Sequence, residues 1–80
     1  MNQLFYTVEA KKKRESIIGD NSTMEQAFQF TEQALRERRL APGKYTERVL
    51  YTKFYLEVEV ERDHTMKITM VEVENVLGDD

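Results

Sequence analysis

The clearest pattern in the chain is an alternation of apolar and polar residues in its C-terminal half. Between positions 47 and 61 the even-numbered residues are mostly apolar, and the odd-numbered ones are mostly charged or tyrosine. Successive side chains of a strand point to opposite faces, so this period of two predicts a half-buried strand. A second run with the same period begins at Met66, with Ile68 and Met70 on the same face. The two runs predict a long β-hairpin from Glu47 to Val76.

Two local features set the expected pairing of this hairpin. The phase of the return strand slips at Met70-Val71, and a β-bulge at that point would keep the apolar residues on one face. A three-residue loop of Asp63, His64 and Thr65 would place Val60 opposite Ile68, which joins two apolar side chains on the same face. We therefore expect the three-residue loop rather than a two-residue turn.

The N-terminal residues show the same alternation over a shorter stretch. Apolar residues occupy the even positions from 4 to 10, which predicts a first strand over residues 3–11. Lys11, Lys12, Lys13 and Arg14 follow, and we expect them to form a basic turn. Residues 16–18 are long enough only for a short second strand that folds back on the first.

One segment has the periodicity of a helix. Apolar residues after position 23 recur at spacings of three and four, which gives the one-sided stripe of an amphipathic helix. Ser22 and Glu25 have the spacing of a capping box, so the helix is expected to begin at Ser22. It should end near Leu40, because Ala41-Pro42-Gly43 interrupts helical structure.

Together these elements predict a single domain of the α+β class over residues 1–80. The expected architecture is one helix packed on a three- to four-stranded mixed or antiparallel sheet, with a long C-terminal β-hairpin, in the order β-(β)-α-β-β. A domain of this size buries only about 60% of the surface that its unfolded chain exposes. Its stability is therefore expected to be modest.

The lengths of the predicted elements leave part of the hairpin uncovered. A helix of ~17 residues spans about 25 Å, whereas a strand of ~15 residues spans about 50 Å. An exposed apolar strip at the distal end would favour a second copy of the chain as its cover, in a two-fold homodimer. The alternative is a strand that breaks near Glu57 and folds back on its own core. The predicted dimer interface consists of Val58, Val60, Met66, Ile68 and Met70.

Composition narrows the class of protein. The chain has no cysteine, which excludes disulfides and thiolate metal sites and fits a reducing cytoplasm. It has no apolar run near ~18 residues and no basic segment followed by an apolar one at its start, so we expect neither a membrane span nor a standard secretion signal. The net charge is −3, with +2 in residues 1–44 and −5 in residues 45–80. An acidic chain is a poor candidate for nonspecific DNA binding.

Glutamates crowd the outer face of the predicted hairpin. The expected register brings Glu57 near Glu72, a repulsion that a basic partner protein would relieve. The alternatives are a solvated strand face, a carboxylate acid/base pair or a divalent-cation site. A flat sheet on a small domain offers little of the concavity that catalysis needs. We therefore interpret these glutamates as a solvated face or as an acidic docking surface.

Aromatic residues fall on the same outer face, where Phe5, Val49, Tyr51 and Tyr55 are expected to lie outside the helix-covered core. Tyrosine and phenylalanine side chains in adjacent positions resemble the anchors of protein interfaces, although isolated apolar side chains on a surface are also ordinary. The predicted partner-binding residues are Phe5, Tyr51, Tyr55, Glu57, Glu59, Glu72 and Glu74.

Two basic clusters could bind nucleic-acid phosphates. A helix antiparallel to the first strand would place them at opposite ends of the domain, so they are not expected to form one groove. The alternatives are a solvated turn, cations that suit the dipole at the end of a helix, and a protein-docking surface. The candidate nucleic-acid contacts are Lys11, Lys12, Lys13, Arg14, Arg36, Arg38 and Arg39.

No motif indicates a catalytic residue, a metal site or a cofactor, because the chain has no glycine-rich phosphate loop, metal-ligand cluster or nucleophile motif. We therefore predict a non-enzymatic binding or regulatory module, a homodimer that engages a protein partner through its hairpin face. A cytoplasmic accessory or inhibitor protein of bacterial or phage origin fits this size. The alternative function is a small nucleic-acid-binding protein that uses Lys11–Arg14 and the basic helix end.

Overall fold

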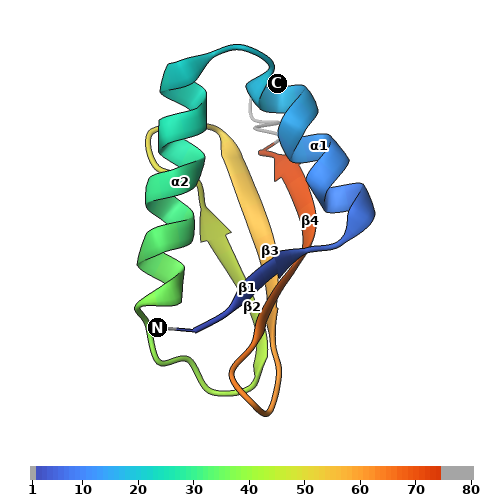
Figure 1. Ribbon diagram of the computed structural model, residues 1–80, viewed down its shortest axis with the longest axis vertical. Coiled ribbons are helices and arrows are strands. Elements are labelled where there is room, and N and C mark those ends of the chain that lie inside the picture. The colour runs from blue at the N-terminus through green and yellow to red at the C-terminus, as the bar shows by residue number, and fades with distance from the viewer. Residues whose placement is uncertain (1, 75–80) are drawn as a thin grey trace, which may run out of the picture.

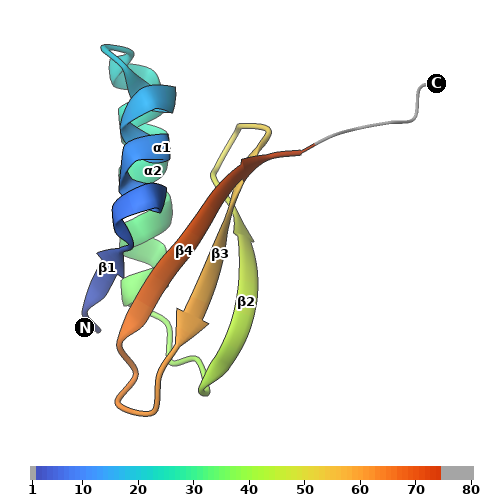
Figure 2. The same ribbon diagram turned by 90° about the vertical axis from the view of Figure 1, so that its right-hand side faces the viewer.

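Two helices pack on one face of a four-stranded mixed sheet in the computed structural model, which describes residues 2–74 (Figure 1). The predicted α+β class is confirmed, with two helices where one was expected. Seen from the side, both helices lie on one side of the sheet, and no helix within residues 2–74 lies on the other face (Figure 2). In chain order the elements are β1 (Leu4–Tyr6), α1 (Val8–Ile18), α2 (Ser22–Arg36), β2 (Gly43–Arg48), β3 (Phe54–Val60) and β4 (Met66–Val73).

The strands are ordered β1-β4-β3-β2 across the sheet. Two of the three neighbouring pairs, β2 with β3 and β3 with β4, are antiparallel, whereas β1 runs parallel to β4. The short strand β1 and the strand β2 therefore form the two edges of the sheet.

The N-terminal region differs from the prediction, because the chain leaves β1 after Tyr6 and enters a helix. The side chain of Thr7 caps this helix by accepting a hydrogen bond from the backbone N–H of Ala10 at 3.2 Å. The predicted basic turn lies inside α1, and so do the residues predicted as a second strand. The helix ends at Gly19, whose positive φ of 53° suits a residue without a Cβ. The strand predicted over residues 3–11 is therefore wrong beyond Tyr6.

The sequence pattern that would predict α1 is weak, because few residues of this helix are buried. Ala10 and Ile18 are its two buried residues, so the apolar stripe that identifies an amphipathic helix is nearly absent. By contrast, α2 buries a full stripe and was predicted correctly as a helix. Asn21 rather than Ser22 caps it, with its side-chain oxygen accepting from the N–H of Met24 at 3.1 Å.

The predicted first arm of the hairpin is two strands rather than one. A turn over residues 49–53 separates β2 from β3, and the N–H of Val49 donates to the carbonyl of Phe54 at 2.9 Å. Tyr51 has a positive φ of 63° in this turn. The continuous strand was therefore wrong, and the break lies earlier than the alternative near Glu57. Because β2 folds back along β3, the hairpin has no long uncovered arm.

The β3–β4 turn has the predicted loop length at a slightly different position. The N–H of Glu61 donates to the carbonyl of Thr65 at 2.9 Å, so the loop consists of Arg62, Asp63 and His64. Val60 pairs with Met66, not with Ile68. This shift of two residues leaves Met66 and Ile68 on their predicted face, whereas Met70, beyond the bulge, pairs with Glu57 and is exposed.

The predicted bulge is present close to its expected position. Val58 pairs with Ile68 and Glu57 pairs with Met70, so β4 has one extra residue, Thr69, at the shift. Glu72 pairs with Tyr55, and the expected repulsion between directly neighbouring glutamates 57 and 72 is absent from the register. Positions 75 and 76, where the strand was predicted to continue, lie outside the described residues.

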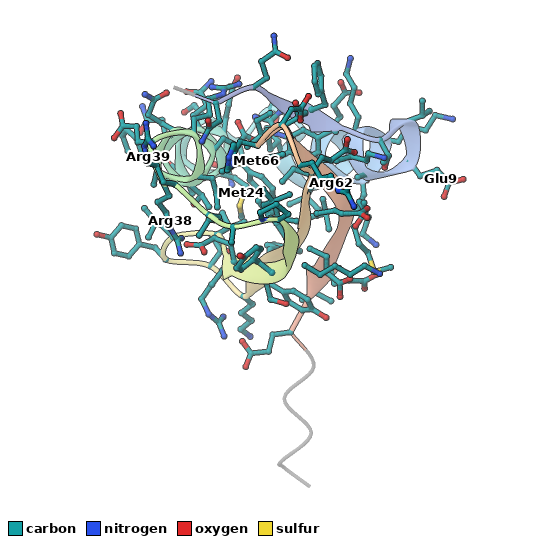
Figure 3. The ribbon with its side chains drawn as sticks, turned by 90° about the horizontal axis from the view of Figure 1, so that it is seen from below. Glu9, Met24, Arg38, Arg39, Arg62 and Met66 are labelled. Carbon is teal, nitrogen blue, oxygen red and sulfur yellow. The ribbon has the colours of Figure 1, made fainter. Side chains whose placement is uncertain are left out.

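The core lies between the helices and the sheet, and Met66 occupies this layer (Figure 3). Four of the five residues predicted for a dimer interface are buried within a single chain, and Met70 alone is exposed, at 42%. These four are Val58, Val60, Met66 and Ile68. The premise of the predicted dimer is therefore wrong, because the two helices already cover most of the strip. Within residues 2–74, no helix has the length and apolar character needed to cross a membrane.

Candidate functional site

The sheet face opposite α1 and α2 is the candidate site, and we call it the open sheet face. Alternation along the strands places apolar side chains toward the helices and polar ones on this face, because successive residues point in opposite directions. It presents side chains from β2, β3 and β4 that share the outward direction in the observed register. They are Lys44, Thr46, Arg48, Tyr55, Glu57, Glu59, Lys67, Thr69 and Glu72.

A hollow of about 370 Å³ lies on the open sheet face. Lys44, Thr46, Glu57, Glu59 and Thr69 contribute to its lining. Across the strands, Lys44 is paired with Glu59, and Thr46 is paired with Glu57. Because directly paired residues on one face are neighbours, the hollow combines carboxylates, a lysine ammonium and hydroxyl groups within a small space.

Charged side chains at the rim of the hollow form ion pairs with one another. Arg48 contacts the carboxylate of Glu74 and donates to the carbonyl of Thr52 at 3.1 Å. The ammonium of Lys67 lies 3.5 Å from the carboxylate of Glu61. Within residues 2–74, no ion pair engages the two carboxylates or the lysine in the hollow. Those three groups are the ones available to a ligand.

The predicted aromatic patch is not assembled. Tyr55 lies on the open sheet face, but Tyr51 projects from the β2–β3 turn with 97% of its surface exposed and lines a separate apolar hollow beside Phe30. Phe5, 53% exposed, belongs to β1, on the far side of β4 from β3. Val49 is fully buried. Of the predicted partner-binding residues, Tyr55 and the three glutamates of β3 and β4 therefore share one face.

The structure joins parts of the two basic clusters that were expected to lie apart. Lys11, Arg14 and Arg36 line one hollow of about 380 Å³ beside β1, because the two helices are connected as a hairpin and the start of α1 lies beside the end of α2. Arg38 is bound elsewhere, 2.7 Å from the carboxylate of Glu47. Arg38 and Arg39 project from the α2 side of the molecule, opposite Glu9 of α1 (Figure 3).

A buried network forms the floor of this second hollow. The guanidinium of Arg14 donates to Glu32 at 2.7 Å, and the Tyr6 hydroxyl donates to the same carboxylate. Burial and the hydrogen bond to Glu32 raise the pKa of Tyr6 far above its usual range. Burial alone would lower the pKa of Arg14, but the hydrogen bond and the charge of Glu32 outweigh it and raise that pKa. The sequence analysis did not predict this network, because Tyr6 and Arg14 lie 26 and 18 positions from Glu32 in the chain.

This network should stabilise the fold by tying β1, α1 and α2 together. Replacing Glu32 with alanine would leave Arg14 partly buried without its carboxylate, so we expect a loss of about 3 kcal/mol in the free energy of unfolding. Urea denaturation followed by circular dichroism would measure it. Glu15→Ala, on the exposed side of α1, is the matched control and should change stability by less than about 0.5 kcal/mol. Equal stabilities for the two variants would contradict a structural role for the network.

Comparison with known proteins identifies the fold. No protein-family model matches the sequence, and a search of curated proteins finds no match. The crystal structure of the isolated RelE toxin from E. coli is similar, with a TM-score of 0.72 and 14% sequence identity. The similarity covers 98% of this chain and 89% of the toxin chain. At this identity the likeness defines the fold.

This comparison corrects the function predicted from the sequence. A non-enzymatic binding module, with a small nucleic-acid-binding protein as the alternative, is contradicted because the fold is shared with a toxin over nearly the whole of both chains. The expectation rested on a long exposed hairpin and on the absence of motifs. In the described residues the predicted arm is the two strands β2 and β3, and the absence of a local motif does not exclude a functional site, because the groups of a site need not be neighbours in sequence.

Proposed function

We propose that this chain is a RelE-type toxin, a ribonuclease that cleaves mRNA at the ribosome. The observation that carries the proposal is the fold, shared with the RelE toxin over 98% of this chain at a TM-score of 0.72. Toxins of that type are ribosome-dependent mRNA endonucleases that bind antitoxin proteins. The substrate would be mRNA in the cytoplasm, and a protein partner would regulate the toxin.

The open sheet face offers groups that suit RNA cleavage. In the simplest reaction, a carboxylate removes the proton from a ribose 2′-hydroxyl. As the proton leaves, the 2′-oxygen forms a bond to the adjacent phosphorus. The bond from phosphorus to the 5′-oxygen breaks, and that oxygen takes a proton from solvent. A nearby cation stabilises the charge that develops on the phosphate. The hollow supplies both kinds of group, in Glu57, Glu59 and Lys44.

Glu57 is the better candidate for the base. It is paired with Thr46, whereas Glu59 is paired with Lys44 on one side and Lys67 on the other. Two lysines that are cross-strand neighbours of Glu59 would compete with a ribose hydroxyl for its carboxylate, and Glu57 has no such neighbour in the register. We therefore assign proton removal to Glu57 and phosphate binding to Lys44, with Lys67 at the edge of the hollow.

Two measurements test the proposal. Induced expression in E. coli should arrest growth, and the purified protein should cleave a short mRNA bound to 70S ribosomes, with cut sites mapped by primer extension. A variant with Glu57→Gln and Lys44→Gln is the matched inactive control, because both residues are on the sheet surface and their loss should leave the fold intact. If the wild-type protein at amounts equal to the ribosomes leaves the mRNA uncut, the proposed activity is wrong.

A further inference from the structure

An uncharged surface lies where the β2–β3 turn meets the start of α2, around a hollow of about 300 Å³. The described residues that line it are all different from those of the hollow proposed to bind mRNA. The turn is fixed against the helix, because the N–H of Leu50 donates to the Thr31 hydroxyl at 3.0 Å and that hydroxyl donates to the carbonyl of Ala27 at 2.9 Å. We call this region the turn surface. The residues that define it are Met24, Gln26, Ala27, Phe30, Leu50 and Tyr51.

The turn surface exposes large apolar side chains. Phe30 is 59% exposed, Leu50 is 42% exposed, and Tyr51 projects almost entirely into solvent. Every described residue that lines the hollow is uncharged, although 34% of the residues in the chain carry a charge. RNA is held mainly by cations that contact its phosphates, so an uncharged lining favours a protein as the occupant.

Tyr51 adopts a backbone conformation that is unfavourable for tyrosine. The N–H of Thr52 donates to the carbonyl of Val49 at 3.1 Å, so Tyr51 is the third residue of a β-turn. Its φ of 63° lies in the left-handed region, where glycine or asparagine is the usual residue at this position. The ring gains little from its own chain, since it is almost fully exposed. Contact with another molecule explains an aromatic residue that strains its turn and buries none of its surface.

We propose that the turn surface binds a second copy of this chain, with Tyr51 of each copy seated in the hollow of the other. A two-fold interface brings the same patch of both copies together, so a projection and a hollow must lie side by side on that patch. Tyr51 and the hollow that it borders meet this requirement. The uncharged lining also brings the copies together without contact between like charges, although each chain carries −3.

The area of the turn surface sets the expected strength of the dimer. An aromatic side chain can bury roughly 150–250 Å², so covering the exposed parts of Phe30 and Tyr51 removes about 300 Å² from each copy. With Met24, Gln26 and Leu50 at the rim, the total for both copies approaches about 1,000 Å², the lower end of the range for specific interfaces. We therefore expect a dimer that dissociates on dilution in the micromolar range.

Sedimentation equilibrium of the purified protein tests this proposal over loading concentrations from about 1 μM to about 200 μM. The average mass of the wild type should rise with concentration toward twice the 9.5 kDa of one chain. Tyr51→Gly should raise the dissociation constant of the dimer at least about tenfold. Glycine suits the positive φ of this position, so the variant should melt at the wild-type temperature or above it, and loss of the dimer could not be attributed to unfolding.

Phe5→Ala is the matched control, because it removes another exposed aromatic side chain from a different part of the molecule, and it should leave the dissociation constant unchanged. A wild-type protein that stays at the mass of one chain at every concentration would overturn the proposal, and so would a dimer that Tyr51→Gly leaves intact. Binding of labelled hexauridylate by the wild type, with its loss in Tyr51→Gly, would assign the turn surface to RNA bases instead. The mass measurement needs neither ribosomes nor cleavage, so failure of this proposal and failure of the proposed activity are distinguishable.

Discussion

Glu57→Gln should lower the rate of mRNA cleavage by about 100-fold or more. Removing a general base costs on the order of 10² to 10⁴ in rate, and glutamine keeps the size of the side chain while losing its ability to accept a proton. Growth arrest on induction should disappear in parallel. Single-turnover cleavage of ribosome-bound mRNA, with the enzyme in excess, measures the chemical step without a contribution from product release.

Three further variants test whether the loss of mRNA cleavage is specific to the carboxylate of Glu57. Glu72→Gln changes a half-buried carboxylate on the same sheet face but outside the hollow, and its rate should match the wild type. Glu59→Gln should reduce the rate less than Glu57→Gln, because the two lysine neighbours of Glu59 compete with the substrate for its carboxylate. Lys44→Gln should slow cleavage by roughly tenfold or more through the loss of phosphate stabilisation. A Glu57→Gln enzyme with full activity would place the base elsewhere.

Ile68→Lys should unfold the protein. Ile68 is fully buried between the helices and the sheet, so the substitution places an unpaired ammonium group in the core. The cost should be at least about 5 kcal/mol, comparable to the total stability of roughly 4–12 kcal/mol expected of 80 residues. Far-ultraviolet circular dichroism and a thermal melt of the purified variant would show the loss of the folded state.

Met70→Lys is the matched control on the same strand. Met70 is 42% exposed and was assigned to the same interface, yet the structure places it outside the core. The variant should fold with nearly unchanged stability and should run at the mass of the wild type in light scattering behind size exclusion. If Ile68→Lys folded normally while Met70→Lys lost stability or changed its mass, the assignment of β4 residues to the core and to the surface would be wrong.

The charge of the open sheet face bears on how a substrate reaches it. The charges of its three cations and three glutamates sum to zero, and two further carboxylates, Glu61 and Glu74, lie at its rim. Nonspecific RNA affinity comes mainly from cations that contact phosphates, so this face should hold free RNA weakly. Activity on mRNA presented by the ribosome is therefore the expected behaviour, and free RNA should be cut far more slowly.

The sequence by itself determined the elements that carry a strong local period. Half-buried strands alternate every second residue and α2 buries a continuous stripe, so the sheet strands after position 54, the bulge and α2 could be predicted from pattern alone. The face of most residues in β3 and β4 was also predictable, because a register shift of two leaves the alternation unchanged, but the bulge at Thr69 turns Met70 away from the predicted apolar face. The outward position of Glu57 and Glu59 follows from the same alternation.

Tertiary structure alone decided the features that rest on contacts between distant segments. Two elements with little periodicity, α1 and the turn over residues 49–53, depend on packing of Ala10 and Ile18 in the core and on pairing of β2 along β3. That fold-back brings Lys44 beside Glu59 and creates the hollow, although these residues are 15 positions apart in the chain. The helix hairpin likewise brings Lys11 and Arg36 together. Such neighbours have no local spacing to mark them, because packing of the whole chain determines which distant side chains meet.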